Sequence, residues 1–99
     1  MAYGTVGKFR IKPGHVDDAI GLVKEWESSR KPNVTGAIAG YTYQLDSDPN
    51  TLMVAAVFAD KAAYVANADD PEQDKWFSRM AEHFAGEPEW NDGEIVSGA

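Results

Sequence analysis

The longest apolar stretch of the chain lies near its middle. The eight residues Leu52–Ala59 are all apolar, and the polar pairs Asn50-Thr51 and Asp60-Lys61 bound the run. A run of this length is too short to cross a membrane and suits a β-strand. A strand with one solvated face would alternate apolar and polar residues, so the pattern predicts that both faces of this strand are buried.

Three other segments also have the pattern of strands. The four strands are predicted at Tyr3–Lys12, Gly36–Leu45, Leu52–Ala59 and Glu94–Ser97. The first strand places Phe9 and Ile11 on one face and its basic residues on the other. The turn-forming residues Asp46–Asn50 join the middle two strands as a hairpin. A second turn, at Asn91–Gly93, precedes the last strand.

Apolar residues at helical spacing predict two main helices and a shorter helical segment. These elements are predicted at His15–Arg30, Lys61–Ala68 and Pro71–Ala85. Asp70 is a good N-cap for the last helix, and Pro71 fits its first helical position. Gln73 would complete a capping-box-like pair with Asp70, and Gly86 would be the C-cap.

The order strand, helix, strand, strand, helix, strand is that of the ferredoxin-like α+β fold, βαββαβ, with a four-stranded antiparallel sheet. Right-handed crossovers place the helices on one face of this sheet. The other face is then bare, although the apolar strand needs cover there. A second copy of the same sheet is the simplest cover, so the sequence predicts a homodimer.

Composition narrows the class of protein. The 99 residues suit a single domain spanning 1–99. The net charge of −7 argues against nucleic acid and anionic membranes as partners, because both need clustered Lys and Arg. With no cysteine, disulfides, thiolate metal sites and a cysteine nucleophile are excluded. Residues Met1–Thr5 have no signal-peptide character, so we expect a cytoplasmic protein.

The two histidines of the chain, His15 and His83, are candidates for metal binding or acid–base chemistry. His15 and His83 have no third clustered ligand, so we expect no metal site. His83 follows Trp76 by nearly two helical turns, which would project both to one side of a helix. There His83 would act as a general base beside an aromatic wall. The alternative is a histidine at the border of the apolar face with no chemical role.

Four residues are candidates for a substrate-binding pocket. Trp76 and Tyr41 would form its walls. Tyr64 and Asn67 lie just before the helix break at Asp69–Pro71, where a pocket can open, and Asn67 would orient a substrate carbonyl or hydroxyl. The alternatives are a core tryptophan, an ordinary strand tyrosine and an asparagine that simply ends the short helix.

Five segments carry a resemblance to a known family. They are Lys12-Pro13-Gly14, Phe58-Ala59-Asp60, Ala62-Ala63-Tyr64, Asp69–Trp76 and Pro88–Glu94. Together with the order of elements, they resemble the antibiotic biosynthesis monooxygenase-like domains of the dimeric α/β-barrel superfamily. The last two segments are similar to a group of small, largely uncharacterised bacterial members.

The resemblance implies sheet-to-sheet homodimers and, in several members, oxidation of polyphenols by molecular oxygen without metal or flavin. It therefore implies a cofactor-independent monooxygenase acting on a small aromatic or polyketide-like compound. The alternative is a non-catalytic dimeric module that binds a small molecule or a protein. Heme-degrading members carry a first-strand Asn and a helix His. Gly7 and Lys75 or Trp76 occupy these positions here, so we expect that heme is not a substrate.

Overall fold

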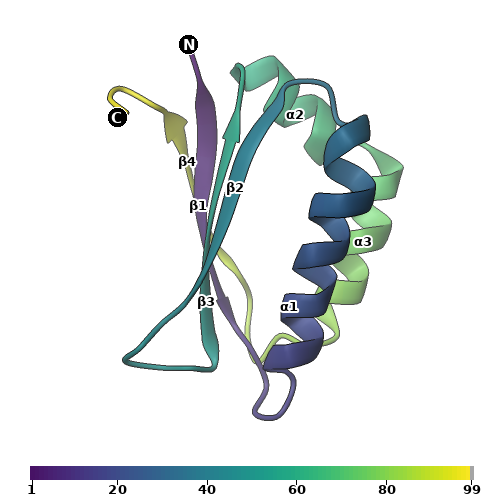
Figure 1. Ribbon diagram of the computed structural model, residues 1–99, viewed down its shortest axis with the longest axis vertical. Coiled ribbons are helices and arrows are strands. Elements are labelled where there is room, and N and C mark those ends of the chain that lie inside the picture. Colours follow the sequence, from purple (N-terminus) through teal and green to yellow (C-terminus); the bar gives the residue numbers. More distant parts are fainter. Residues whose placement is uncertain (99) are drawn as a thin grey trace.

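A computed structural model describes residues 1–98 as one antiparallel sheet with helices on one side (Figure 1). The elements are β1 (Tyr3–Arg10), α1 (Val16–Glu25), β2 (Ala37–Gln44), β3 (Thr51–Phe58), α2 (Lys61–Ala68), α3 (Pro71–Ala81) and β4 (Glu89–Glu94). The strand order β2-β3-β1-β4 confirms the predicted ferredoxin-like α+β fold. No helix within residues 1–98 is long and apolar enough to cross a membrane.

Alternation along the strands gives the sheet two different faces. Phe9 pairs with Leu52 in the β1–β3 ladder, and both side chains are buried beneath the helices. We call this helix-covered side the inner face. The opposite, outer face carries Val6 and Tyr41, which both pair with Ala55 and are 46% and 61% exposed. Only the inner face is covered within one chain.

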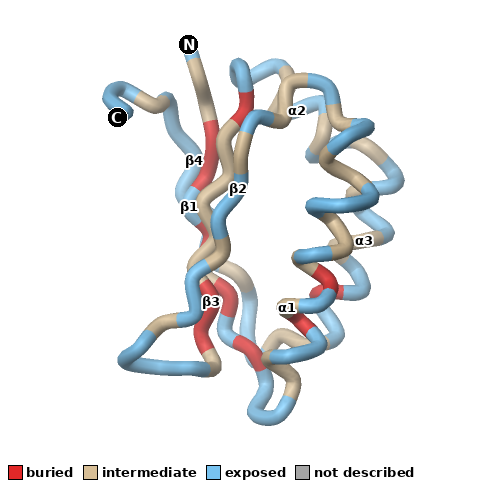
Figure 2. Tube along the Cα trace, viewed as in Figure 1, coloured by how far each residue is buried: buried red, intermediate tan, exposed pale blue. Residues whose placement is uncertain are grey.

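The packed core lies toward one end of the space between the sheet and the helices. Its buried members come from β1, α1, β3, α3 and the turn after β1, and are Phe9, Ile11, Ala19, Leu22, Leu52 and Met80. Figure 2 shows buried segments at the lower ends of α1 and of the sheet, and further buried segments higher in the sheet. The residues of the packed core join the sheet to the helices at the end where α1 begins.

Local signals explain where several elements begin. The Asp48 carboxylate accepts hydrogen bonds from the Thr51 hydroxyl at 2.7 Å and the Asn50 backbone N–H at 3.1 Å. These bonds lower the pKa of Asp48 and close the predicted β2–β3 hairpin. Asp70 caps α3, as predicted, by accepting from the Glu72 N–H at 2.9 Å. Pro71 is the first residue of α3.

The predicted capping box does not form. The side-chain oxygen of Gln73 accepts a hydrogen bond from the Trp26 indole N–H at 2.7 Å instead. The backbone N–H of Asp70, which a capping box would satisfy, donates to the Asn67 carbonyl at 3.1 Å. Gln73 therefore links α3 to the helical segment that contains Trp26 and does not cap its own helix.

The first helix differs from its prediction at the C-terminal end. α1 ends at Glu25, and the chain continues as a π-helical turn, Trp26–Arg30, followed by a 3₁₀ turn, Lys31–Asn33. The predicted helix to Arg30 thus covers two kinds of helical winding. The π-helical turn begins at Trp26 and changes the helical winding of the residues after it, and such turns are often found at functional sites.

The predicted last strand, Glu94–Ser97, is wrong. The strand is β4, and the predicted turn Asn91–Gly93 lies inside it. Each β4 residue pairs with β1, from Glu89 opposite Lys8 to Glu94 opposite Tyr3. Turn-forming residues are tolerated because β4 is an edge strand that relies on backbone pairing, and every one of its residues is exposed.

The second main helix also ends earlier than predicted, at Ala81 rather than Ala85. The residues that follow it pair with the end of β1. Ala85 N–H donates to the Arg10 carbonyl at 2.7 Å, and Phe84 forms a bridge with Ile11. Gly86 therefore lies beyond this pairing and does not cap the helix.

The apolar strand is less buried within one chain than its pattern predicts. Thr51, Leu52 and Phe58 of β3 are buried, whereas Met53–Val57 are only half-buried. The inner side of this segment borders a cavity, and its outer side belongs to the uncovered face of the sheet.

Candidate functional site

A cavity of about 740 Å³ lies between the inner face and the helices. All four strands and all three helices of the described chain contribute to its lining. Cavities of this size suit small organic ligands. The lining is mostly apolar and includes all three tryptophans of the chain, Trp26, Trp76 and Trp90.

Hydrogen bonds hold two of the tryptophan rings in place. The Trp26 indole N–H donates to Gln73 of α3, and the Trp76 indole N–H donates to the Leu22 carbonyl of α1 at 2.8 Å. The ring centroids lie 6.4 Å apart. Because each N–H is already satisfied within the protein, the rings offer a ligand mainly their apolar surfaces.

One part of the cavity lining is polar. The Tyr64 hydroxyl of α2 donates a hydrogen bond to the Asp92 carboxylate of β4 at 2.8 Å. The pKa of Tyr64 is raised to about 12, mainly by burial. The hydrogen bond to Asp92 and the negative charge of Asp92 also raise this pKa. The phenol therefore stays protonated at neutral pH and keeps its proton directed at the carboxylate.

The Thr5 hydroxyl is the unsatisfied group of this polar region. It is buried, lines the cavity and has no hydrogen-bond partner of good geometry among residues 1–98. It lies near the Tyr64 phenol and slightly opposes the rise in the Tyr64 pKa. A buried hydroxyl without a partner is costly, so a polar group of a ligand or a water would be stabilised beside it.

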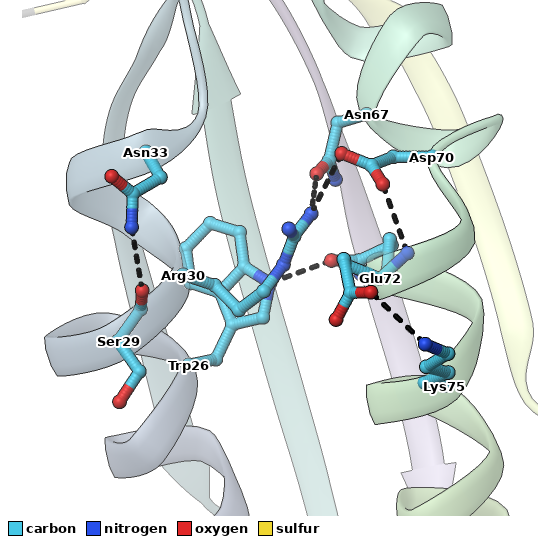
Figure 3. Close-up of polar contacts among 9 residues, drawn as sticks. Trp26, Ser29, Arg30, Asn33, Asn67, Asp70, Glu72 and Lys75 are labelled. Atoms are coloured by element: carbon cyan, nitrogen blue, oxygen red, sulfur yellow. Dashed lines mark hydrogen bonds and ion pairs between the residues drawn. The ribbon is translucent and has the colours of Figure 1, made fainter.

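Asn67 lines the cavity and is held by an arginine from the π-helical turn. Arg30 Nη2 donates to Asn67 Oδ1 at 3.0 Å and lies 3.5 Å from an Asp70 carboxylate oxygen (Figure 3). The Arg30 side chain is only 16% exposed. Since Oδ1 is already an acceptor for Arg30, Asn67 would approach a ligand as a donor, through Nδ2.

The structure brings three predicted site residues together and separates the other two. Tyr64, Asn67 and Trp76 line the cavity, and His83 does not. Tyr41 borders the cavity from β2, but its side chain lies on the outer face opposite Ala55 and is 61% exposed. The shared side expected for Trp76 and His83 is not observed, because α3 ends at Ala81. The cavity geometry therefore gives no support to a general-base role for His83.

His83 instead lies beside His15. Their Nδ1 atoms are 3.0 Å apart, and Asp18 offers a carboxylate to the same group. The expectation that no third ligand would cluster with the two histidines is thus wrong. The cluster was hidden in the sequence because His83 lies far along the chain from the other two.

Thr5, Trp90 and Asp92 are among the cavity residues that were not selected from the sequence. Thr5 lies two positions from Gly7 and four from Phe9 on the same face of β1, so its place on the inner face follows from alternation. Trp90 and Asp92 fell within a segment that was expected to be loop and turn. Their positions depend on the pairing of β4 with β1.

Solved structures of other proteins share the fold of this chain. No protein-family model and no functionally curated protein matches the sequence. A provisionally named antibiotic biosynthesis monooxygenase from Chloroflexus aurantiacus aligns over 100% of this chain and 97% of its own, with a TM-score of 0.83 and 23% identity. One from Caulobacter crescentus aligns over 97% and 91%, with a TM-score of 0.88 and 14% identity.

A conserved protein from Methanosarcina mazei aligns over 95% of this chain and 92% of its own, with a TM-score of 0.81 and 22% identity. The chain thus has the ferredoxin-like fold that the antibiotic biosynthesis monooxygenase-like proteins share, which confirms the resemblance at the level of the fold. Function has to be argued from the site, because one fold can host unrelated activities.

Proposed function

We propose that the protein is a small monooxygenase that binds an aromatic or polyketide-like compound in the cavity and oxidises it with molecular oxygen. The observation that carries this proposal is the cavity of about 740 Å³, walled by tryptophans and polar at Thr5, Tyr64 and Asp92. Such a site suits a flat, apolar molecule with a few oxygen substituents. The fold shared with provisionally named monooxygenases supports the same assignment.

The proposed reaction needs no metal or flavin, because the substrate itself supplies the electrons. Loss of a proton from an activated CH₂ group of a polyphenol leaves an electron-rich anion. The anion reduces oxygen and combines with it to form a hydroperoxide. Loss of water then leaves a carbonyl group, so one oxygen atom enters the product and the other enters water.

The cavity residues would divide this work. The Asp92 carboxylate would accept the proton from the substrate. The Tyr64 phenol holds this carboxylate in position through their 2.8 Å hydrogen bond. Thr5 and the Nδ2 of Asn67 would bind substrate oxygens. The apolar tryptophan surfaces would exclude water from the anion, which strengthens the electrostatic interactions within the site.

The test is oxygen uptake with a panel of polyphenolic compounds, with ¹⁸O₂ used to follow the oxygen atoms. We expect one labelled oxygen in the product. Asp92→Asn should lower turnover by roughly 10²–10⁴-fold, the usual contribution of a general base. Glu27→Gln is the matched control, because Glu27 is a second carboxylate in the lining. Equal losses in the two variants would refute the role of Asp92.

A non-catalytic binding module is the alternative function. The histidine that was expected to act as the base lies outside the cavity, which favours this alternative. It predicts that an aromatic compound remains bound through purification and is not consumed under oxygen. Native mass spectrometry followed by an oxygen electrode separates the two functions.

We infer that the protein forms a homodimer through the outer face of the sheet. On this face Val6, Tyr41 and Tyr43 are 46%, 61% and 59% exposed, and Ala55 lies between Val6 and Tyr41. All the helices of the described chain lie on the opposite side. A second copy would cover the apolar outer side of β3 with a surface of the same chemistry.

A further inference from the structure

One group of side chains outside the cavity has the composition of a metal site. Among residues 1–98, only His15, Asp18 and His83 form a group of three or more potential ligands close enough to hold one ion. None of the three lines the cavity. We propose that they bind a divalent transition-metal ion of the zinc class.

The distances fit a single ion. The two Nδ1 atoms are 3.0 Å apart, and the ligand atoms of all three residues lie within 4.8 Å of one another. Zinc bonds of about 2.0–2.2 Å to nitrogen and oxygen place neighbouring ligand atoms roughly 3.0–3.5 Å apart. The histidine pair already has that spacing, and the exposed Asp18 side chain needs only a small adjustment.

The backbone holds both histidines in this arrangement. Lys12 donates its N–H to the His83 carbonyl at 2.9 Å and accepts the His15 N–H at 3.0 Å through its own carbonyl. His15 is the N-cap residue of α1, and Asp18 lies in the first turn of that helix. The three ligands are therefore positioned by one short frame before any ion binds, which lowers the cost of ordering them.

The choice of ion follows from the ligand atoms. Two imidazoles and one carboxylate suit Zn²⁺, Co²⁺ or Ni²⁺, whereas Mg²⁺ prefers oxygen ligands alone. The N-terminus of α1 disfavours a cation, and the acidic residues Asp17 and Asp18 in the first turn offset this effect. Because Asp18 is exposed, the remaining coordination positions would be open to water.

A bound ion would join two distant parts of the chain. Asp18 and His15 belong to the start of α1, and His83 belongs to the turn after α3. Such a link forms only in the folded state, so the ion should raise thermal stability. The site would thus strengthen the end of the molecule where the packed core already lies.

Thermal unfolding of metal-free protein, prepared without a histidine tag, tests the proposal. Saturating Zn²⁺ should raise the melting temperature by about 5–15 °C, and Mg²⁺ at the same concentration should not. Co²⁺ should give visible absorption bands with an extinction typical of low coordination number. No zinc shift, or an equal shift with Mg²⁺, would overturn the proposal.

Variants assign the ligands. His15→Gln and His83→Gln should each abolish the zinc shift and the cobalt bands. Asp18→Asn should lose most of the shift, and Asp17→Asn, which removes the same charge one residue earlier, should keep it. A circular dichroism spectrum and a melting temperature without metal confirm that each variant folds. If the glutamine variants respond as the unmodified protein does, zinc binds elsewhere and the proposal is wrong.

Discussion

The two ends of the space between the sheet and the helices differ in how they are filled. At one end Ile11, Leu52 and Met80 are fully buried and pack in a continuous core. At the other end the same sheet and helices enclose about 740 Å³. The packed end therefore supplies most of the stability. At the other end, which we call the hollow end, the residues that line the cavity can differ without loss of the core.

Side-chain size explains part of this difference. The β2 and β3 residues that line the cavity include Ala37, Gly40 and Ala56, which project little into the space beneath the helices. The packed end has Leu52 of β3 at full burial. Interiors are normally filled to crystal-like density, so a space of this size is a feature to be explained by function.

The largest effect is expected from breaking the packed end. Leu52→Ala should lower the free energy of unfolding by about 2–5 kcal/mol, because it removes a fully buried side chain and leaves a hole. Ile38→Ala is the control at the cavity, where Ile38 is 54% exposed, and should cost less than about 1 kcal/mol. Urea denaturation measures both values. Equal losses would show that stability is not concentrated at one end.

The second largest effect concerns the two faces of β3. Ala55 lies on the outer face and Ala56 on the inner face beside the cavity. Ala55→Asp should weaken the proposed dimer by roughly 10-fold to 100-fold, because an unpaired carboxylate would be buried between two sheets. Sedimentation velocity across a concentration series measures this change.

Two controls sharpen the assignment of the faces. Ala55→Ser adds polarity without charge and should leave most of the dimer. Ala56→Asp should leave the sedimentation of folded protein unchanged and reduce binding in the cavity. If the unmodified chain sediments as a monomer of about 11 kDa at micromolar concentration, the dimer proposal fails.

A smaller effect is expected at the polar part of the cavity. Tyr64→Phe removes the hydrogen bond to Asp92 and should cost about 0.5–1.5 kcal/mol at neutral pH. The pKa of Tyr64 rises from its ordinary 10.0 to about 12 in the folded protein. The folded state therefore holds the phenol proton more tightly than the unfolded state does. The resulting stability is present below pH 10 and is lost as the pH rises toward about 12.

The difference in urea midpoint between the unmodified chain and Tyr64→Phe, followed from pH 8 to pH 12, isolates this contribution from other titrating groups. It should shrink above pH 10. Tyr41→Phe is the matched control, since the Tyr41 side chain is 61% exposed. A constant difference across this range would contradict the Tyr64–Asp92 interaction.

The sequence predicts the elements that local signals determine and little of the polar chemistry of the cavity. The β2–β3 hairpin and the N-cap Asp70 depend on neighbouring residues, so local patterns are enough to predict them. β4 and the early end of α3 depend on backbone pairing with β1 across the whole chain. Asp92 and the His15–His83 contact arise from that pairing, so no local signal could reveal them. The cytoplasmic location and the single domain remain predictions from the sequence.

The smallest effect is expected from heme, which tests whether the hollow end is selective. The family resemblance places Gly7 where heme-degrading proteins carry a first-strand Asn, and the Trp90 ring lies 3.0 Å from where a side chain at Gly7 would begin. The Trp76 indole N–H is already bound to the Leu22 carbonyl. Because neither histidine lines the cavity and a side chain at Gly7 would lack space, heme should leave the melting temperature of the protein and the Soret band of heme unchanged. Tight stoichiometric binding with a Soret shift, followed by reductant-driven turnover, would show that the cavity accepts heme and that its walls rearrange.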